Sequence, residues 1–512
     1  MVTSPHPMAS EAGRDVLARG GNAIEAAIAM AATLSVVYPH FTGLGGDAFW
    51  LIAQPDGAVR ALSGIGQAAQ DCSGYEGRAA IPVRGAASTL TSAAAVDSWG
   101  KAFAISRDSW QGRCRWDELL APAIALAEQG VPVSRSQRFW AQERAGETAA
   151  WPGFEAVFAP GAPTLRQPQL ARSLQRLAAF GARDFYEGGL ARYLAQGLAD
   201  AGSPLTLADL ERTHAREEAP LCLPYRQGWL HTFAPPTQGI STLQAMGMLE
   251  QVDFSAVAEG GAAHYHLMVE AIKLAFIDRD RFVADPDFVA VPVDALLAPD
   301  YLAAQFKRIS SMSARSWPQP FRHGDTVFMG AADAQGRGVS LLQTIYFDWG
   351  SGVVVGDTGV LWHNRGAAFS LDPAHPNVLR PGKRPFHTLN PGIYTVGGKP
   401  RLLYGTQGAD GQPQTLVALL TRLIDYGMDP RQAMARPRFL LGRTFSDARD
   451  TVKLEADVGP DVIETLKALG HEISLIPAQS PLAGQPGVIR MSPDGSLCGA
   501  HDPRSEGCAL GV

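Results

Sequence analysis

A predicted β-hairpin at residues 327–346 constrains the fold of this chain more than any other segment. Val327–Met329 and Val339–Tyr346 consist largely of β-branched, aromatic and other apolar residues, which suit buried or half-buried strands. Ala334–Gly336 between them fit a three-residue loop whose glycine adopts a left-handed conformation. The segment therefore predicts two paired antiparallel strands within a mixed α and β fold.

The register of this hairpin brings two hydroxyl side chains together. If Asp333 pairs with Arg337, Thr326 lies opposite Thr344 at the open end of the hairpin, with Cβ atoms about 5 Å apart. Thr–Thr pairs are common across strands, so this pair alone does not indicate a catalytic site. The flanking sequence decides how it is interpreted.

Short motifs surround the hairpin in a distinctive order, and others lie near both ends of the chain. Those around the hairpin are Asp325-Thr326, Gln343–Tyr346, Gly350–Gly352, Gly359–Arg365 and Pro381–Thr388, and the distant ones are Pro5–Ser10, Gly43–Phe49 and Asp502–Ser505. Together they resemble the γ-glutamyltranspeptidase family over nearly the whole chain. The resemblance implies an α/β (α+β) fold of the N-terminal nucleophile type, an αββα sandwich of stacked antiparallel sheets between helical layers.

Members of this family are made as one inactive chain that cuts itself before a threonine. The resemblance places the cleavage site between Asp325 and Thr326, so that residues 1–325 form the large (α) subunit and residues 326–512 the small (β) subunit. Thr326 is then both a new N-terminus and the nucleophile. Its freed α-amine, with an unperturbed pKa of about 7.7–8.0, is partly neutral at physiological pH and can serve as the general base that a threonine hydroxyl needs.

The hairpin and the family pattern suggest partners for this nucleophile. The predicted register lets Thr344 hydrogen-bond and orient the Thr326 hydroxyl. Gly408 and Ala409, which precede a predicted helix at residues 415–426, align with the glycine-rich oxyanion loop of the family. Their backbone N–H groups would stabilise the tetrahedral intermediate.

Departures from the family pattern bear on the substrate. The arginine that holds the α-carboxylate in transpeptidases would fall near Ile65, and the aspartate that holds the α-amine would fall on Ala368. His387 and Thr388 replace the paired serines of the family, and Tyr346 replaces an asparagine. A buried ammonium without a counter-charge costs several kcal/mol, so an amino-acid donor such as glutathione is disfavoured.

The remaining groups favour a small amide that carries a carboxylate but no amine. Arg365 offers a planar fork for the carboxylate, and Tyr346, His387 and Thr388 are expected beside it as substrate-binding residues. The pattern looks most like family members that hydrolyse oxamate to oxalate and ammonia in purine-nitrogen use.

Other activities compete with this hypothesis. A glutathione hydrolase or γ-glutamyltransferase would share the machinery, as would a cephalosporin (glutaryl) acylase, whose pocket would be crowded by Tyr346, Trp349 and Trp362. A non-enzymatic binding relative would have lost Thr326 or the Gly408 loop, and this chain has kept both.

No metal or other cofactor is expected. The candidate metal ligands are His264, His266, Glu270 and Asp278. The same predicted helix carries Lys273 and Arg279, so ion pairs and satisfied polar contacts explain these residues better.

Composition excludes several classes of partner. A net charge of −6 and a pI near 6.1 give no reason to expect nucleic acid. Five scattered cysteines without CxxC spacing indicate reduced thiols rather than a disulfide framework. No signal-like segment opens the chain, and the apolar stretch Ala23–Val37 is shorter than a membrane span, which predicts a buried helix. We expect a cytoplasmic protein whose partners are a small-molecule amide and its own cleaved subunit, as a heterodimer or a dimer of heterodimers.

Overall fold

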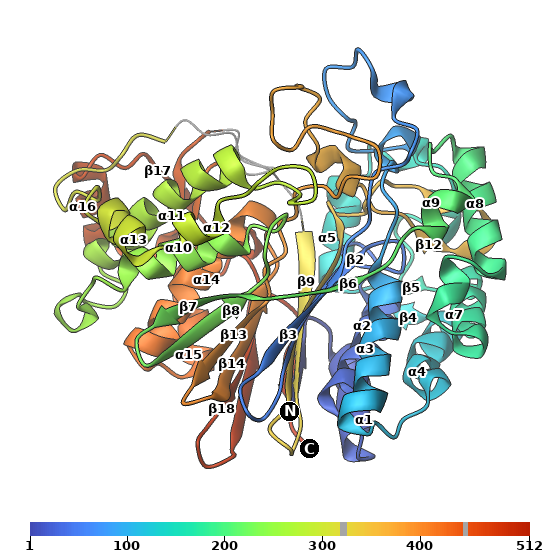
Figure 1. Ribbon diagram of the computed structural model, residues 1–512, viewed down its shortest axis with the longest axis horizontal. Helices are drawn as coiled ribbons and strands as arrows, with labels where there is room; N and C mark the ends of the chain where they lie inside the picture. The colour runs from blue at the N-terminus through green and yellow to red at the C-terminus, as the bar shows by residue number, and fades with distance from the viewer. Residues whose placement is uncertain (318–324, 444–448) are drawn as a thin grey trace.

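Two β-sheets stack face to face between two layers of helices (Figure 1). The computed structural model describes residues 1–317, 325–443 and 449–512. The arrangement confirms the αββα sandwich expected from the sequence. Within the described residues, no helix is both long enough and apolar enough to cross a membrane.

The first sheet has seven strands, and each of its neighbouring pairs is antiparallel. Its order is β20 (Cys508–Leu510), β1 (Val2–Ser4), β9 (Asp325–Ala332), β10 (Gly338–Tyr346), β2 (Asp47–Ala53), β3 (Val59–Gly64) and β6 (Arg216–Glu218). The predicted hairpin, β9 and β10, therefore lies at the centre of this sheet.

The second sheet has six strands, again antiparallel throughout. Its order is β19 (Leu497–His501), β18 (Pro486–Met491), β14 (Lys399–Thr406), β13 (Gly392–Val396), β8 (Gly228–Thr232) and β7 (Leu221–Tyr225). Smaller sheets are formed by β15 (Phe439–Leu441), β16 (Val452–Glu455) and β17 (Ile473–Ile476), by β4 (Val131–Pro132) and β5 (Thr164–Leu165), and by β11 (Val354–Val355) and β12 (Val360–Leu361).

The central strand β9 is buried on both faces because its side chains alternate between two cores. Val327, Met329 and Ala331 pack against the helices on one side. Phe328 and Ala332 point the other way, into the core between the two sheets. A strand covered on both faces needs an apolar residue at nearly every position, which explains the unbroken apolar run in the sequence.

One helical layer packs on the seven-stranded sheet and the other on the six-stranded sheet (Figure 1). The first contains α1 (Pro7–Ala18), α2 (Ala23–Val37), α3 (Ala95–Trp110), α4 (Trp116–Gln129), α5 (Arg135–Glu143), α6 (Phe154–Val157), α7 (Pro168–Phe180), α8 (Gly189–Ala201) and α9 (Leu207–Glu211). The second contains α10 (Gly239–Leu249), α11 (Ala262–Phe282), α12 (Val293–Leu296), α13 (Pro299–Phe306), α14 (Gln412–Leu420), α15 (Pro430–Ala435) and α16 (Pro460–Ala468).

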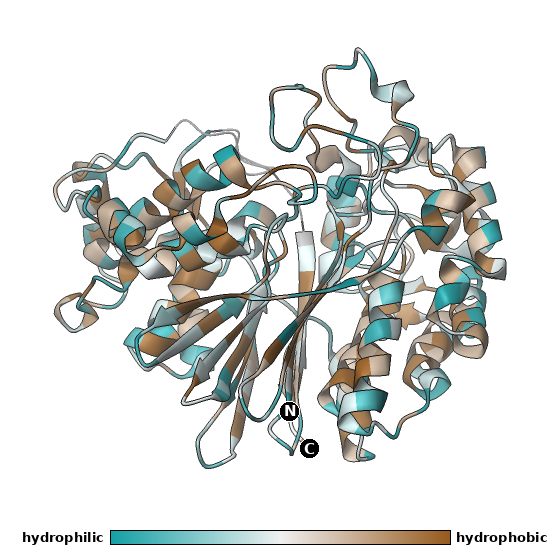
Figure 2. Ribbon diagram, viewed as in Figure 1, coloured by the Kyte–Doolittle hydropathy of each residue, from teal (hydrophilic) through white to brown (hydrophobic). Residues whose placement is uncertain are grey.

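Helix α2 confirms the buried helix predicted from the apolar stretch. Every residue of Ala23–Val37 is buried, and the helix begins with a capping box formed by Asn22 and Glu25. Figure 2 shows hydrophobic residues along the strands between the helical layers, whereas the outer helices also carry many hydrophilic residues. Helix α2 is thus an inner helix of its layer, and α3 and α4 pack around it.

The hairpin register matches the prediction along most of its length and then changes. Asp333 pairs with Arg337 across a loop in which Gly336 has a φ of 76°, and the register continues to the pair Gln343–Val327. Beyond that pair a bulge shifts the register, so that Tyr346 pairs with Asp325. The expectation that Thr326 lies directly opposite Thr344 is therefore wrong, because the extra residue in β10 disrupts the ladder at that point.

Close packing at the start of β2 requires a glycine. Thr344 pairs with Asp47 across β10 and β2, and Gly46 precedes Asp47. A Cβ atom on Gly46 would lie only 2.1 Å from the carbonyl oxygen of Thr344. The two strands can approach each other at this position only because residue 46 has no side chain.

We expect Gly46→Ala to lower the free energy of unfolding by about 1–3 kcal/mol or more, since the added methyl group forces the two backbones apart. Gly74→Ala is the matched control, because nothing lies within 4 Å of a Cβ atom there. Thermal unfolding of both variants measures the effect. Equal midpoints for the two variants would contradict the proposed close packing.

Candidate active site

Thr326 lies at the start of β9 and is fully buried. The amide nitrogen of Gln412, the first residue of α14, lies 3.5 Å from the Thr326 hydroxyl, a long hydrogen bond. The Gln412 side-chain oxygen accepts the backbone N–H of Asn390 at 3.2 Å. Sequence reasoning missed Gln412, although it lies only three residues after the predicted oxyanion loop. The side chain of Asp325, on the other side of the predicted cleavage site, lies outside what the structure describes.

The predicted oxyanion loop joins β14 to the first turn before α14. Gly408 has a φ of 122° and Ala409 a φ of 45°, and Ala409 opens a short 3₁₀ helix, Ala409–Gly411. The first N–H groups of a helix have no partner within it, so this turn presents donors. The Gln238 amide binds both the Ala409 carbonyl at 2.7 Å and the Thr388 carbonyl at 2.8 Å, which fixes the loop beside the 387–388 segment.

Arg365 is a fully buried cation. Its guanidinium carbon lies 3.6 Å from the centre of the Tyr346 ring. None of its three side-chain nitrogens has a hydrogen-bond partner among the described residues. Burial lowers the pKa of Arg365 to about 10, although Tyr346, Asp47 and Asp410 oppose that shift. The side chain therefore remains charged at neutral pH, and a carboxylate would supply both the counter-charge and the missing acceptors.

His387 belongs to a buried network centred on Asp47, a residue that the sequence analysis placed in a motif but gave no role. An Asp47 carboxylate oxygen lies 3.3 Å from Nε2 of His387 and 3.5 Å from Nδ1 of His363. Burial is the largest cause, and the nearby Arg365 charge the second, of a pKa of His387 lowered to about 3. Burial alone would raise the pKa of Asp47, but the two histidines hold it below its usual value.

His387 and Thr388, both predicted to bind the substrate, differ in whether their side-chain polar groups already have hydrogen-bond partners. His387 donates to Asp47 through Nε2, and its Nδ1 accepts the backbone N–H of Leu389 at 3.4 Å. The Thr388 hydroxyl is buried and has no hydrogen-bond partner among the described residues. Thr388 thus keeps a free polar group in the site, whereas both ring nitrogens of His387 are engaged.

Thr344 shapes the site through the backbone. Its hydroxyl accepts the N–H of Tyr346 at 2.8 Å and so supports the bulge in β10. Tyr346 has a φ of 79°, unusual for a residue with a side chain, and this conformation accompanies its stacking on Arg365. A hydrogen bond from Thr344 to the Thr326 hydroxyl stays a prediction.

Two of the three aromatic residues expected to crowd the pocket lie elsewhere. Trp349 packs against Phe154 and Phe158 in the helical layer. Trp362 stacks on Phe185 in the same layer. Of the three, Tyr346 is the residue whose ring packs on Arg365. The expectation of crowding by all three is wrong, because Trp349, in the turn after β10, and Trp362, after β12, pack into the helical layer.

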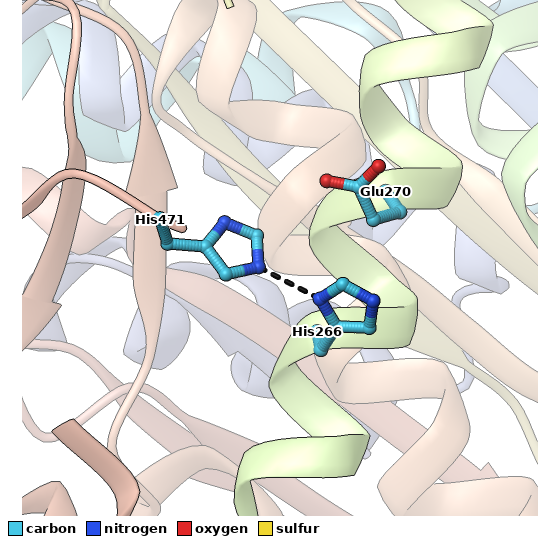
Figure 3. Close-up of side chains that lie close together, drawn as sticks. All are labelled: His266, Glu270 and His471. Atoms are coloured by element: carbon cyan, nitrogen blue, oxygen red, sulfur yellow. Dashed lines mark hydrogen bonds between the residues drawn. The ribbon is translucent and has the colours of Figure 1, made fainter. Parts of the chain in front are cut away.

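A separate polar cluster joins His266 and Glu270 of α11 to His471, which lies just before β17, and the ligand atoms of the three lie within 4.8 Å of one another (Figure 3). Nε2 of His266 donates to the Ser310 carbonyl at 2.7 Å, so Nδ1 accepts from His471 at 2.8 Å. Glu270 binds the Lys273 ammonium at 2.7 Å.

These contacts fit a tether better than a metal site. Nδ1 of His266 and Nε2 of His471 already share a proton, and the Lys273 ammonium already binds the Glu270 carboxylate. Glu270 also accepts the backbone N–H of Arg315, so the cluster holds residues 310–315 against α11. Of the other candidate ligands that the sequence analysis set aside, His264 binds Thr421 and Asp278 binds Gln244 and Tyr301, apart from this cluster.

Comparison with known proteins identifies the family. Residues 9–512 match the family described as gamma-glutamyltranspeptidase. The chain is 43% identical to the oxamate amidohydrolase proenzyme of Klebsiella pneumoniae, over all of this chain and 98% of that protein. The chain belongs to the γ-glutamyltranspeptidase family. It is also 30% identical to the glutathione hydrolase proenzyme of Escherichia coli, covering 99% of this chain and 90% of that protein.

The fold also matches that of solved structures. The cephalosporin acylase from Bacillus halodurans superposes with a TM-score of 0.89 at 30% sequence identity, over 99% of this chain and 94% of that one. The chain is therefore an enzyme of a hydrolase family, with the N-terminal nucleophile fold that the sequence motifs implied. The relatives' names also support synthesis as a proenzyme.

The tether on α11 yields a stability prediction. The side chains of Lys273 and Glu270 are only 3% and 2% exposed, so Glu270→Gln would leave a buried ammonium without its counter-charge. We expect a loss of about 3–5 kcal/mol, seen as a lower thermal midpoint. Glu464→Gln removes an equally spaced pair with Lys467, whose side chains are 72% and 50% exposed, and should change little.

A metal titration distinguishes the tether from a metal site. We expect Zn²⁺ to leave the unfolding midpoint of the unmodified protein unchanged. A rise in that midpoint that disappears in His471→Ala would show that the cluster is a metal site instead.

Proposed function

We propose that this chain is a self-processing, threonine-dependent amidohydrolase that cuts the bond between Asp325 and Thr326. The products are a large subunit, residues 1–325, and a small subunit, residues 326–512, which remain together because both parts contribute paired strands to each of the two large sheets. The position of Thr326 on the central strand and the proenzyme names of the relatives support this proposal.

One hydroxyl performs both processing and turnover in this mechanism. Before the cut, Oγ1 of Thr326 attacks the carbonyl carbon of Asp325, and the peptide C–N bond breaks to give an ester and the free α-amine. Water then hydrolyses the ester, which releases the Asp325 carboxylate and restores the Thr326 hydroxyl. After the cut, this amine takes the proton from the same hydroxyl as it attacks the substrate amide. The N–H groups of Gly408 and Ala409 stabilise the oxyanion, each by roughly 3–4 kcal/mol in comparable sites.

The substrate proposal rests on one observation, the buried guanidinium of Arg365, which has no hydrogen-bond partner among the residues that the structure describes. The acyl part of the substrate carries a carboxylate that binds Arg365, with Thr388 as a further donor. The position of the family's carboxylate-binding arginine corresponds to Ile65, which packs in the core between the sheets, and Ala368 offers no acid for an amine. A γ-glutamyl donor would therefore lack the partner of its ammonium group.

Oxamate is the best match among such amides, and its products would be oxalate and ammonia. The relative from Klebsiella pneumoniae is named for this activity and is 43% identical over the full chain. We place the reaction in purine-nitrogen use and in the cytoplasm. A cephalosporin (glutaryl) acylase is the second candidate, favoured by the structural similarity to the Bacillus halodurans enzyme.

Processing is tested on the purified protein. We expect two fragments whose smaller member begins at Thr326, and we expect Thr326→Ala to give one uncut and inactive chain. Thr326→Ser keeps a hydroxyl and should still cut itself, which controls for folding. N-terminal sequencing and mass spectrometry measure the outcome, and a fragment that starts at another residue would refute the nucleophile assignment.

The role of Arg365 is tested with three amides. Processed enzyme should release ammonia from oxamate faster than it cleaves a γ-glutamyl anilide or a glutaryl amide. Arg365→Met should lower kcat/KM for oxamate by roughly 10²-fold, because a charge-assisted pair is lost, without preventing the cut. Arg14→Met, at an exposed site, is the control. Preference for the γ-glutamyl compound would overturn the substrate proposal.

A further inference from the structure

Gln238 lies beside two segments of the proposed active site. The residue is fully buried and comes directly before α10. Its backbone N–H donates to the His387 carbonyl at 2.9 Å, and the His387 N–H donates to the carbonyl of Pro236, also at 2.9 Å. From this position the Gln238 side chain reaches the backbone of residues 388 and 409.

The orientation of the Gln238 amide is fixed by its three partners. Its Oε1 accepts from Nη1 of Arg279 at 3.1 Å, and a guanidinium is only a donor. Its Nε2 donates to the carbonyl oxygens of Thr388 at 2.8 Å and Ala409 at 2.7 Å, which are only acceptors. The two amide hydrogens thus meet two acceptors, and a flipped amide would set like groups against each other at all three contacts.

Arg279 of α11 also binds the turn that follows the 408–409 loop. Its Nη1 lies 3.3 Å from a carboxylate oxygen of Asp410. Its Nη2 lies 2.9 Å from Asp280, and the centre of the Phe276 ring lies 3.9 Å from the guanidinium carbon. The Arg279 side chain is only 3% exposed, so these contacts hold it in one place between Gln238 and Asp410.

The Gln238 contact acts on a backbone conformation that alanine rarely adopts. Ala409 has a φ of 45°, in the left-handed region, which costs a residue with a side chain roughly 1–2 kcal/mol. Rotation about φ moves the N–H of Ala409 relative to its own carbonyl, and Gln238 holds that carbonyl. Release of the carbonyl would let φ return to negative values and turn the N–H out of its present direction.

The same amide joins the two sides of the proposed site. One nitrogen atom binds the carbonyls of both Thr388 and Ala409, so the 408–409 loop cannot move away from the segment that carries the Thr388 hydroxyl. A displacement of about 1 Å in such a site can lower the rate roughly 10²-fold. The placement of the loop is therefore a matter of catalysis as well as of stability.

We propose that Gln238 and Arg279 are positioning residues for the 408–409 loop. Gln238 holds Ala409 in its left-handed conformation, and Arg279 holds the Gln238 amide in the orientation that this contact requires. Both act through the loop and not on the reacting atoms. The inference rests on the proposed function, because it requires that the N–H groups of residues 408 and 409 stabilise the oxyanion.

The test compares Gln238→Met with Gln244→Met in self-processed enzyme. Gln244 is the matched control, because it is 1% exposed and its amide donates at 2.8 Å to Asp278, outside the proposed site. We expect kcat and kcat/KM of Gln238→Met for oxamate to fall together by roughly 10²-fold, since the lost interaction is made only in the transition state. Gln244→Met should lower the thermal midpoint by a similar amount and keep its kcat. Rates are counted per cut chain by mass spectrometry.

A second variant separates the carbonyl contacts of Gln238 from its Arg279 contact. Gln238→Glu keeps the size of the side chain and an oxygen for Arg279, but a carboxylate cannot donate to the carbonyls of Thr388 and Ala409. We expect its kcat to fall as far as that of Gln238→Met, and it carries the test by itself if Gln238→Met does not fold. Arg279→Lys keeps a donor for the Gln238 oxygen and should retain more activity than Arg279→Met.

The outcomes separate this inference from the function on which it rests. Equal kcat in Gln238→Met and Gln244→Met would overturn the positioning role, as would full kcat in Gln238→Glu. A rise in KM with kcat unchanged would also overturn it, because it indicates lost substrate binding. If the unmodified enzyme does not hydrolyse oxamate, the same comparison is made with the γ-glutamyl anilide or the glutaryl amide, since the loop acts on any acyl group. Hydrolysis of none of the three would overturn the proposed function, and this inference with it.

Discussion

Burial of the central hairpin on both faces is the constraint on which the rest of the structure depends. β9 packs one set of side chains against helices and the other against the second sheet, so it cannot shift without disturbing both cores. The site lies where four strands begin or end: β9 begins at Asp325, β10 ends at Tyr346, β2 begins at Asp47 and β14 ends at Thr406. A rigid double sheet therefore fixes the relative positions of Thr326, Arg365 and residues 408–409, which lie on separate segments of the chain.

Buried charge is the second organising element of the site. Arg365 has no hydrogen-bond partner among the described residues, and Asp47 and Asp410 support its charge only through space. Each of these acids has its own partners, since Asp47 faces two histidines and Asp410 lies 3.3 Å from Arg279. The arrangement keeps a positive charge in the site while leaving the donors of the guanidinium unused, which suits the binding of an anionic substrate group.

Sequence reasoning succeeded where local pattern and motif order carry the information. The apolar runs of the hairpin predicted β9 and β10, Gly336 predicted the loop conformation, and the stretch Ala23–Val37 predicted a buried helix with those bounds. It missed the bulge at the end of β10, which sets two residues, Thr344 and Ile345, opposite Thr326 in place of the predicted one-to-one pair. A bulge depends on contacts with neighbouring strands, and the period-2 pattern of a strand does not reveal it.

The sequence by itself determined the family, the layered fold and the likeness of Asp325-Thr326 to a self-cleavage site, because these follow from residue types in a fixed order. Only the tertiary structure decided that Gln412 reaches Thr326, that Asp47 engages His387 and that Trp349 and Trp362 point away from the site. Each of these depends on distances between segments that are far apart in the sequence or on the direction of a single side chain, and packing across the whole fold sets both.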